Sequence, residues 1–141
     1  MYRQRRCARR PRDRGAAAIE FALVLPFLLL IIFGTIDFGR AINAQIVLTE
    51  AAREGARLAA LGQSEPAVVA RTQSAATGLS PVTVTVTGCA PGAGPVADAT
   101  VAVSYQFSFV TPVGDIAALF FGGGLGSPIT MTAQGVMPCE T

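Results

Sequence analysis

The sequence has 141 residues and a formal net charge of +2; 51% of its residues are hydrophobic and 14% are charged, against about 25% charged residues in an average soluble domain. It contains no histidine and three cysteines, which excludes histidine-based catalytic triads, histidine-ligated metal sites and zinc sites built from four cysteines. A soluble enzyme is therefore disfavoured, and much of the chain is expected to lie outside water.

The first 14 residues form a strongly basic arm. Seven of the eleven arginines lie there beside a single acid, Asp13, which gives the arm a net charge of +6 and leaves −4 on the rest of the chain. A nucleic-acid-binding arm would interleave aromatic residues with its cations, but Tyr2 is the only aromatic residue here. The arm leads straight into an apolar segment, so we interpret it as the cytoplasmic flank of a membrane span and expect no nucleic-acid partner.

Residues 16–36 form this apolar segment, AAAIEFALVLPFLLLIIFGTI, whose only charged residue is Glu20. A helix of this length extends about 30 Å, the thickness of a bilayer core. The positive-inside rule predicts a single span with the N-terminus in the cytoplasm and the C-terminus outside. A cleaved secretory or twin-arginine signal is the alternative, but its small-residue cleavage site should follow a shorter apolar run, whereas here the alanines precede the run.

Helical character continues through residues 37–61, which lack strong helix breakers. We therefore predict one helix from Ala16 to Leu61, with residues 37–61 as its extracytoplasmic extension. Charged residues on one side of this extension can pair at three-residue spacing: Glu50, Arg53, Glu54 and Arg57. Three small residues spaced four apart form a shallow stripe: Ala51, Gly55 and Ala59. The stripe could receive another helix or pack against the chain's own head, and the pattern favours neither interpretation.

Residues 62–141 are predicted to form a small extracytoplasmic head. A short second helix is expected over residues 65–77, because Pro66 suits a first helical turn and Gly78 suits a helix end. The periodicity then becomes that of a strand in three stretches, at residues 82–87, 101–109 and 129–134. The predicted fold class is α+β, with the long N-terminal helix packed on a small antiparallel sheet that has one apolar face.

The connections of the head offer no catalytic arrangement. The glycine-rich run at residues 122–126 does not follow a strand and open a helix, as a phosphate-binding loop would, and the acidic residues of the head are scattered. We therefore expect no enzymatic activity, no cofactor, no metal and no small-molecule substrate. The apolar residues 116–121 are expected to pack under the sheet, with contact to a partner or to lipid as the alternative.

The three cysteines fall on two sides of the predicted membrane. Cys7 belongs to the basic arm and so to the reducing cytoplasm, whereas Cys89 and Cys139 would lie outside, where a disulfide can persist. A bridge between these two would close a loop of about 50 residues and, on the chain-entropy model, stabilise the head by about 4 kcal/mol.

Glu20 is the unusual residue of the apolar segment. A carboxylate inside a membrane span is costly and normally has a partner, unless it faces the headgroups at the membrane edge. If the peptide bond after Gly15 were cut, Ala16 would acquire a free amine and Glu20 would become the fifth residue of the product. An amine and a carboxylate would then lie together at an apolar helix end.

Arg14 and Gly15 followed by AAAIEFALVLPFLLL resemble the processing site of type IV prepilins, which a prepilin peptidase cuts after glycine and which carry glutamate at position five of the product. The longer run RGAAAIEFALVLPFLLLIIFGTIDFGRAINAQIVLTEAAREGARLAA resembles the TadE family of minor pilins, or pseudopilins, of the tight-adherence (Tad) type IV pilus. The resemblance covers about residues 14–60. It places the family's features on Gly15 before the cut, Ala16 as the new N-terminus, Glu20, Phe21 and Pro26 in the span, residues 37–40 at its outer end and residues 52–57 on the extension.

This resemblance implies a role in assembling an adhesive pilus, with the membrane, a prepilin peptidase, other Tad pilins and the inner-membrane assembly platform as partners. The chain would consist of a leader (1–15), a transmembrane helix (16–36), its extension (37–61) and the head (62–141). Glu20 would pair with the Ala16 amine of an adjacent subunit, and Pro26 would allow a local bend. Two alternatives remain: an unprocessed single-pass scaffold or adaptor, and a tethered enzyme or receptor head.

Overall fold

The computed structural model describes residues 13–89, 97–111, 114 and 127–139. Two helices are followed by three strands: α1 (Asp13–Ala60), α2 (Glu65–Ala75), β1 (Val82–Thr87), β2 (Asp98–Phe107) and β3 (Ile129–Pro138). The α+β fold class predicted above is confirmed. The basic arm up to residue 12 with Cys7, the apolar residues 116–121 and the glycine-rich run 122–126 lie outside the described residues.

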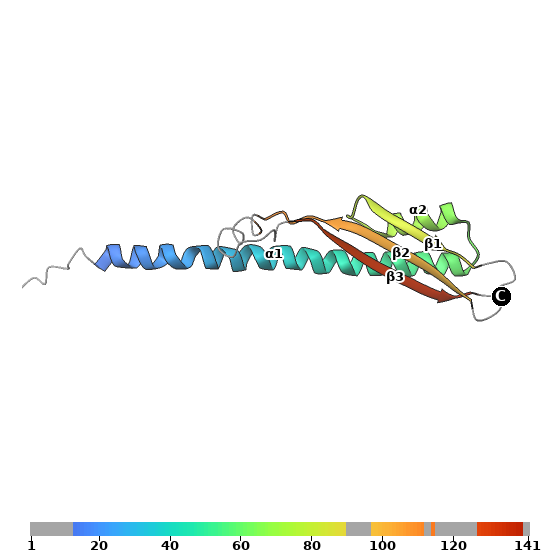
Figure 1. The fold of residues 1–141 in the computed structure, drawn as a ribbon, viewed down its shortest axis with the longest axis horizontal. Helices are drawn as coiled ribbons and strands as arrows, with labels where there is room; N and C mark the ends of the chain where they lie inside the picture. Colours follow the sequence, from blue (N-terminus) through green and yellow to red (C-terminus); the bar gives the residue numbers. More distant parts are fainter. Residues whose placement is uncertain (1–12, 90–96, 112–113, 115–126, 140–141) are drawn as a thin grey trace, which may run out of the picture.

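The long helix α1 has 48 residues and continues through Pro26 without a break. It begins three residues before the predicted start and ends one residue before the predicted end. Figure 1 shows that its N-terminal half projects away from the head, whereas the sheet lies along its C-terminal half. The head therefore packs on one half of α1, and the other half of α1 lies outside the described part of the head.

Two glycines with left-handed backbone conformations end the helical segments. Gly62, at φ 70°, follows α1, and the amide of Gln63 donates to the Leu58 carbonyl, which closes the helix end. Gly78, at φ 80°, follows α2. The helix α2 begins with Pro66 in its first turn, as predicted, and ends two residues before the predicted Thr77. These turns direct the chain back along α1 into β1.

The sheet is antiparallel, in the order β1-β2-β3. Its register pairs Val84 with Val103 and Val103 with Ala133, so that apolar residues of all three strands share one face. This face packs against α1, mainly through β2 and β3, and α2 packs beside β1 (Figure 1). The prediction of a three-stranded sheet covered by the long helix is confirmed.

Small residues allow α1 to approach the sheet and α2 closely. Ala51 and Ala52 are fully buried, and a Cβ on Gly55 would meet the side chains of Thr72 and Val101. A Cβ on Gly135 of β3 would meet the backbone of Ala52. The structure therefore decides between the two interpretations of the small-residue stripe, because its members pack against the chain's own head.

The charged face of the extension forms one of its two predicted pairs. Arg53 lies 3.5 Å from Glu50, three residues earlier in α1. Glu54, however, accepts from Arg71 of α2 at 3.0 Å and not from Arg57, so the second expected pair is wrong. The reason is tertiary: α2 folds back beside α1 and brings a guanidinium to Glu54 from outside the helix.

Candidate functional site

The N-terminal half of α1 presents a long apolar surface. Phe21 is 61% exposed, and other large apolar residues of this half are similarly accessible: Ile19, Leu23, Val24, Leu28, Ile31, Ile32 and Ile36. Monomeric soluble proteins rarely expose contiguous apolar surface of this extent. By length and composition this is a helix that can cross a membrane, and its apolar stretch is not buried anywhere within the described chain.

The residues predicted for processing and subunit pairing all lie on this projecting half. Gly15, Ala16 and Glu20 are exposed, and Gly15 is the third residue of α1. Within the described part of the chain, the Glu20 side chain forms no hydrogen bond or ion pair, and a Cβ on Gly15 would meet nothing within 4 Å. Phe21 is exposed and Pro26 half-buried, and the fold brings neither of them against the head. These residues are accessible to another molecule.

Asp37 joins the projecting half of α1 to the head. It lies directly after the apolar segment and is 3% exposed, with its carboxylate turned to the chain that follows β2. The amides of Val110 and Thr111 donate to its two oxygens at 3.3 and 3.2 Å, and the Thr111 hydroxyl also donates to it. Arg40 completes the set with an ion pair of 3.1 Å. We call these four residues the Asp37 junction.

Hydrogen bonds to the charged form lower the pKa of Asp37 below its ordinary value. The Thr111 hydroxyl contributes most, and burial opposes it by disfavouring the charge. The two backbone amides and Arg40 add further to the lowering. Asp37 is therefore held as a carboxylate at neutral pH, which keeps its ion pair with Arg40 and its acceptor bonds intact.

Arg40 also contacts the aromatic end of β2. Its guanidinium lies 5.3 Å from the centre of the Phe107 ring, and Phe107 packs edge-on against Phe109 at 5.5 Å. Planar guanidinium groups favour such stacking on aromatic faces. Arg40 therefore lies between a carboxylate and a ring, with its side chain still 43% exposed.

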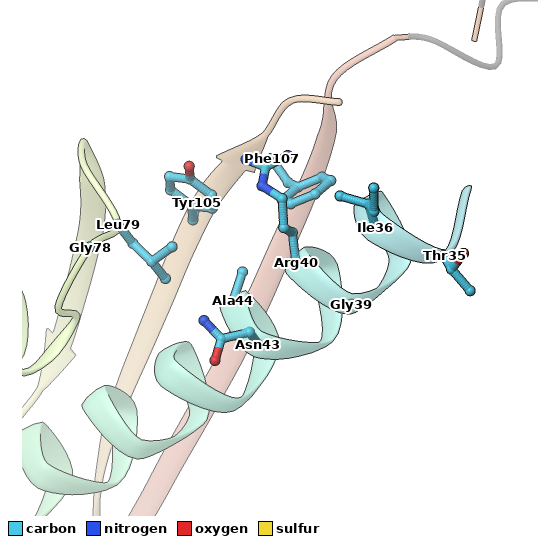
Figure 2. A pocket seen from close by; sticks show the side chains of 10 residues that line it. All are labelled: Thr35, Ile36, Gly39, Arg40, Asn43, Ala44, Gly78, Leu79, Tyr105 and Phe107. Atoms are coloured by element: carbon cyan, nitrogen blue, oxygen red, sulfur yellow. The ribbon is translucent and has the colours of Figure 1, made fainter. Parts of the chain in front are cut away.

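A groove of about 490 Å³ opens beside Arg40, between α1, β2 and the connection from α2 to β1. Figure 2 shows Arg40 reaching from α1 toward Phe107, with Tyr105 beside it on β2 and Leu79 across the groove. The floor on α1 is formed by residues on one side of the helix, from the end of the apolar segment outward: Thr35, Ile36, Gly39, Asn43 and Ala44.

At the opposite end of the head, Cys89 and Cys139 form a disulfide, with Cα atoms 5.9 Å apart. Cys89 follows β1 and Cys139 follows β3, so the bridge joins the two outer strands of the sheet. The amide of Cys139 donates to the Ala97 carbonyl at 2.9 Å, and Cys139 is 9% exposed and belongs to the core. The part of the chain that the structure describes contains no group of three metal-ligating acidic, cysteine or histidine side chains.

Two features of this region were not predicted from the sequence: the partners of Asp37 and the groove. The signal for the first was present, since an acid directly after an apolar run, with arginine three residues later, is a polar pair at the end of a span. Thr111 is 74 residues away, however, so no local pattern connects it to Asp37. The groove likewise depends on three separate segments.

A long apolar helix projects from a small head, and a second helix and an antiparallel sheet pack against its other half. This arrangement defines a pilin-like α+β protein. Residues 15–57 match the family of TadE-like proteins, so the chain carries a TadE-like domain. That domain lies entirely within α1, and α2 and the sheet are outside it. No curated protein and no solved structure matches the chain.

Proposed function

We propose that this chain is a minor pilin, or pseudopilin, that takes part in assembling a Tad-type adhesive pilus. The observation that carries the proposal is the division of α1: its C-terminal half is the core helix of a small head, and its N-terminal half is an exposed apolar rod. The TadE-like domain at residues 15–57 includes both the rod and most of the head's helix. The proposed role is structural, without catalysis, and this division of α1 supports it.

In this proposal the chain is anchored in the cytoplasmic membrane by residues 16–36, with the basic leader 1–15 in the cytoplasm. The extension 37–61 and the head 62–141 lie outside. The charge supports this orientation, because seven of the eleven arginines precede the apolar segment. In an assembled fibre the same apolar surface would be covered by neighbouring helices, so one segment serves both the membrane and the pilus.

Processing by a prepilin peptidase would cut after Gly15 and leave Ala16 as the new N-terminus. The Glu20 carboxylate would then pair with the Ala16 amine of an adjacent subunit and neutralise it in the apolar interior, with Phe21 and Pro26 contributing to the contact. Four of these residues, Gly15, Ala16, Glu20 and Phe21, are exposed, and this supports the proposal, since a peptidase or another subunit can reach them. The expected partners are other Tad pilins and the inner-membrane assembly platform.

The mature N-terminus tests this function. Removal of 15 of the 141 residues should leave a membrane-extracted protein of 126 residues beginning at Ala16, seen by N-terminal sequencing and intact mass. Gly15→Leu should block cleavage, whereas Gly34→Leu should be cleaved normally, because both glycines have open space at Cβ and only the first precedes the cut. Peptides from residues 1–14 on the mature protein, in cells with an active peptidase, would instead indicate an unprocessed single-pass scaffold.

A further inference from the structure

The groove beside Arg40 has no role in subunit pairing through Glu20, which lies about 30 Å away along the helix. Its volume of about 490 Å³ lies within the range of small-molecule sites. Among the ten described residues that line it, Arg40 is the only charged one; Thr35, Asn43 and Tyr105 are polar, and the rest are apolar residues or glycines. The groove therefore presents one guanidinium, which is also ion-paired with Asp37, at a partly apolar surface.

The position of the groove along α1 places it close to the membrane surface, if residues 16–36 span the bilayer core as proposed above. Thr35 and Ile36, which line one end of the groove, are the last residues of the apolar segment. Arg40 lies four residues farther, about 6 Å along the helix axis. Because the headgroup layer on each side of a bilayer core is about 5–7 Å thick, Arg40 lies at the level of the lipid phosphates.

The Arg40 guanidinium has N–H groups that remain able to donate hydrogen bonds to an anion. It has five N–H groups, and in the described part of the chain only its Nη1 nitrogen binds a carboxylate, that of Asp37. The charge of Asp37 is in turn shared with the two amides and the hydroxyl of residues 110 and 111, so Arg40 is one partner among several. Arginine binds phosphate oxygens in a bidentate geometry through such remaining N–H groups.

The rest of the groove matches the chemistry next to a lipid phosphate. Polar groups come from Asn43, three residues after Arg40 on α1, and from Tyr105 on β2. Apolar surface comes from Ile36, Leu79 and Phe107 (Figure 2). We propose that the groove binds one phospholipid of the leaflet on the head's side, with the phosphate on Arg40 and the glycerol and first methylene groups against the apolar residues. The bound lipid would fix the head's height and tilt above the membrane.

Retention of phospholipid by the full-length protein tests this inference. The protein is reconstituted in bilayers of phosphatidylglycerol and phosphatidylethanolamine, extracted in mild detergent, and examined by native mass spectrometry for bound lipid. The wild-type protein should retain one phospholipid. The apparent affinity of Arg40→Gln should fall by about tenfold or more, the cost of losing a hydrogen bond between charged groups.

Two further variants separate the groove from general effects. Gly39→Leu should abolish retention by occupying the groove, and it keeps the Arg40 guanidinium in the protein; the Cβ itself is accommodated, because it meets nothing within 4 Å. Arg53→Gln is the matched control: Arg53 also pairs with an acid three residues earlier, but it lies about 20 Å farther out along α1. It should retain lipid like the wild type.

Vesicle flotation distinguishes failure of this inference from failure of the proposed function. The wild type and all three variants should float with vesicles, because the apolar segment and not the groove anchors them. A wild type that does not float would overturn membrane anchoring itself. Three results, each together with normal flotation, would overturn the lipid site alone. They are equal lipid retention by the wild type and Arg40→Gln, lipid retention by Gly39→Leu, and a second copy of the chain bound in place of lipid.

Discussion

Two carboxylates on α1 lie in opposite surroundings: Asp37 is buried and Glu20 is exposed. Asp37 is buried and receives donors from Val110, Thr111 and Arg40, all within the chain. Glu20 is exposed on the projecting half and has no such partner within the described residues. Asp37 therefore stabilises the fold, whereas Glu20 is left accessible, as its proposed pairing with the Ala16 amine of another subunit requires.

For Glu20→Gln we expect normal membrane insertion and normal cleavage but weak pilus assembly. A neutral amide costs less than a charge in the bilayer, so insertion is retained. In the fibre the amine of Ala16 would lose its carboxylate partner, at a cost of about 3–5 kcal/mol for breaking a buried pair. Co-isolation with other pilins and surface fibre counts measure the effect. Glu50→Gln, on the exposed face of the extension, is the control, and wild-type assembly by Glu20→Gln would show that the pairing is wrong.

For Asp37→Asn we expect a lower unfolding midpoint at neutral pH, because an amide cannot accept the three N–H and O–H donors and the ion pair as a carboxylate does. The pKa of Asp37 is lowered in the folded state, so its stabilisation is present above the unfolded pKa of about 3.9 and is lost as the pH falls through the folded value. Thermal unfolding between pH 7 and pH 2 should show the two proteins converging at the acid end. Asp98→Asn, at an exposed carboxylate, is the control and should change the unfolding midpoint little. A difference in unfolding midpoint between wild type and Asp37→Asn that does not vary with pH would contradict this explanation.

At the scale of elements, the packing of α1 on the sheet depends on backbone approach. Gly135 of β3 faces Ala52 of α1 so closely that a methyl group there would meet the Ala52 carbonyl. Val101, opposite Gly135 in the register, is fully buried under Gly55. The small-residue stripe is therefore an intramolecular feature of the head, and it is already covered before any subunit meets another.

Gly135→Ala should destabilise the head by about 1–3 kcal/mol, the usual cost of overpacking a close contact, because two backbone segments must separate. Denaturant unfolding of the full-length protein in detergent, followed by near-ultraviolet circular dichroism of its tyrosines, measures the change. Gly88→Ala is the control, since a Cβ there meets nothing within 4 Å and the substitution should stabilise by about 0.4–1 kcal/mol. Equal stability of the two variants would show that the helix and sheet are less closely packed than described.

At the scale of the whole molecule, each end of the head has its own stabilising link. The Asp37 junction ties the chain after β2 to the point where the apolar segment ends, and the disulfide ties β1 to β3 near the other end of α1. Between them the sheet lies along the helix (Figure 1).

Reduction of the disulfide between Cys89 and Cys139 should slow migration in a denaturing gel relative to the non-reduced protein, since opening a loop of 50 residues makes the unfolded chain more extended. It should also lower the free energy of unfolding by about 4 kcal/mol on the chain-entropy model. Thiol labelling and gels with and without reductant measure both. Cys7→Ser should leave the gel shift unchanged, and free thiols at both head cysteines in freshly isolated protein would contradict the bridge.

The sequence by itself determined the elements of this protein. The apolar run, the 3.6-residue periodicity after it and the alternating residues of the strands identify one long helix and three strands, because local periodicity reports which side of an element is buried. These are properties of contiguous segments.

Only the tertiary structure decided which segments meet. Glu54 binds Arg71 and not Arg57, the small-residue stripe packs on its own head, and Asp37 binds Thr111 from 74 residues away. The groove beside Arg40 exists because α1, β2 and the turn after α2 converge there. Such contacts depend on how the chain returns along α1, and the energies of local pairs, a few tenths of a kcal/mol each, are too small to select one partner over another before the head is packed.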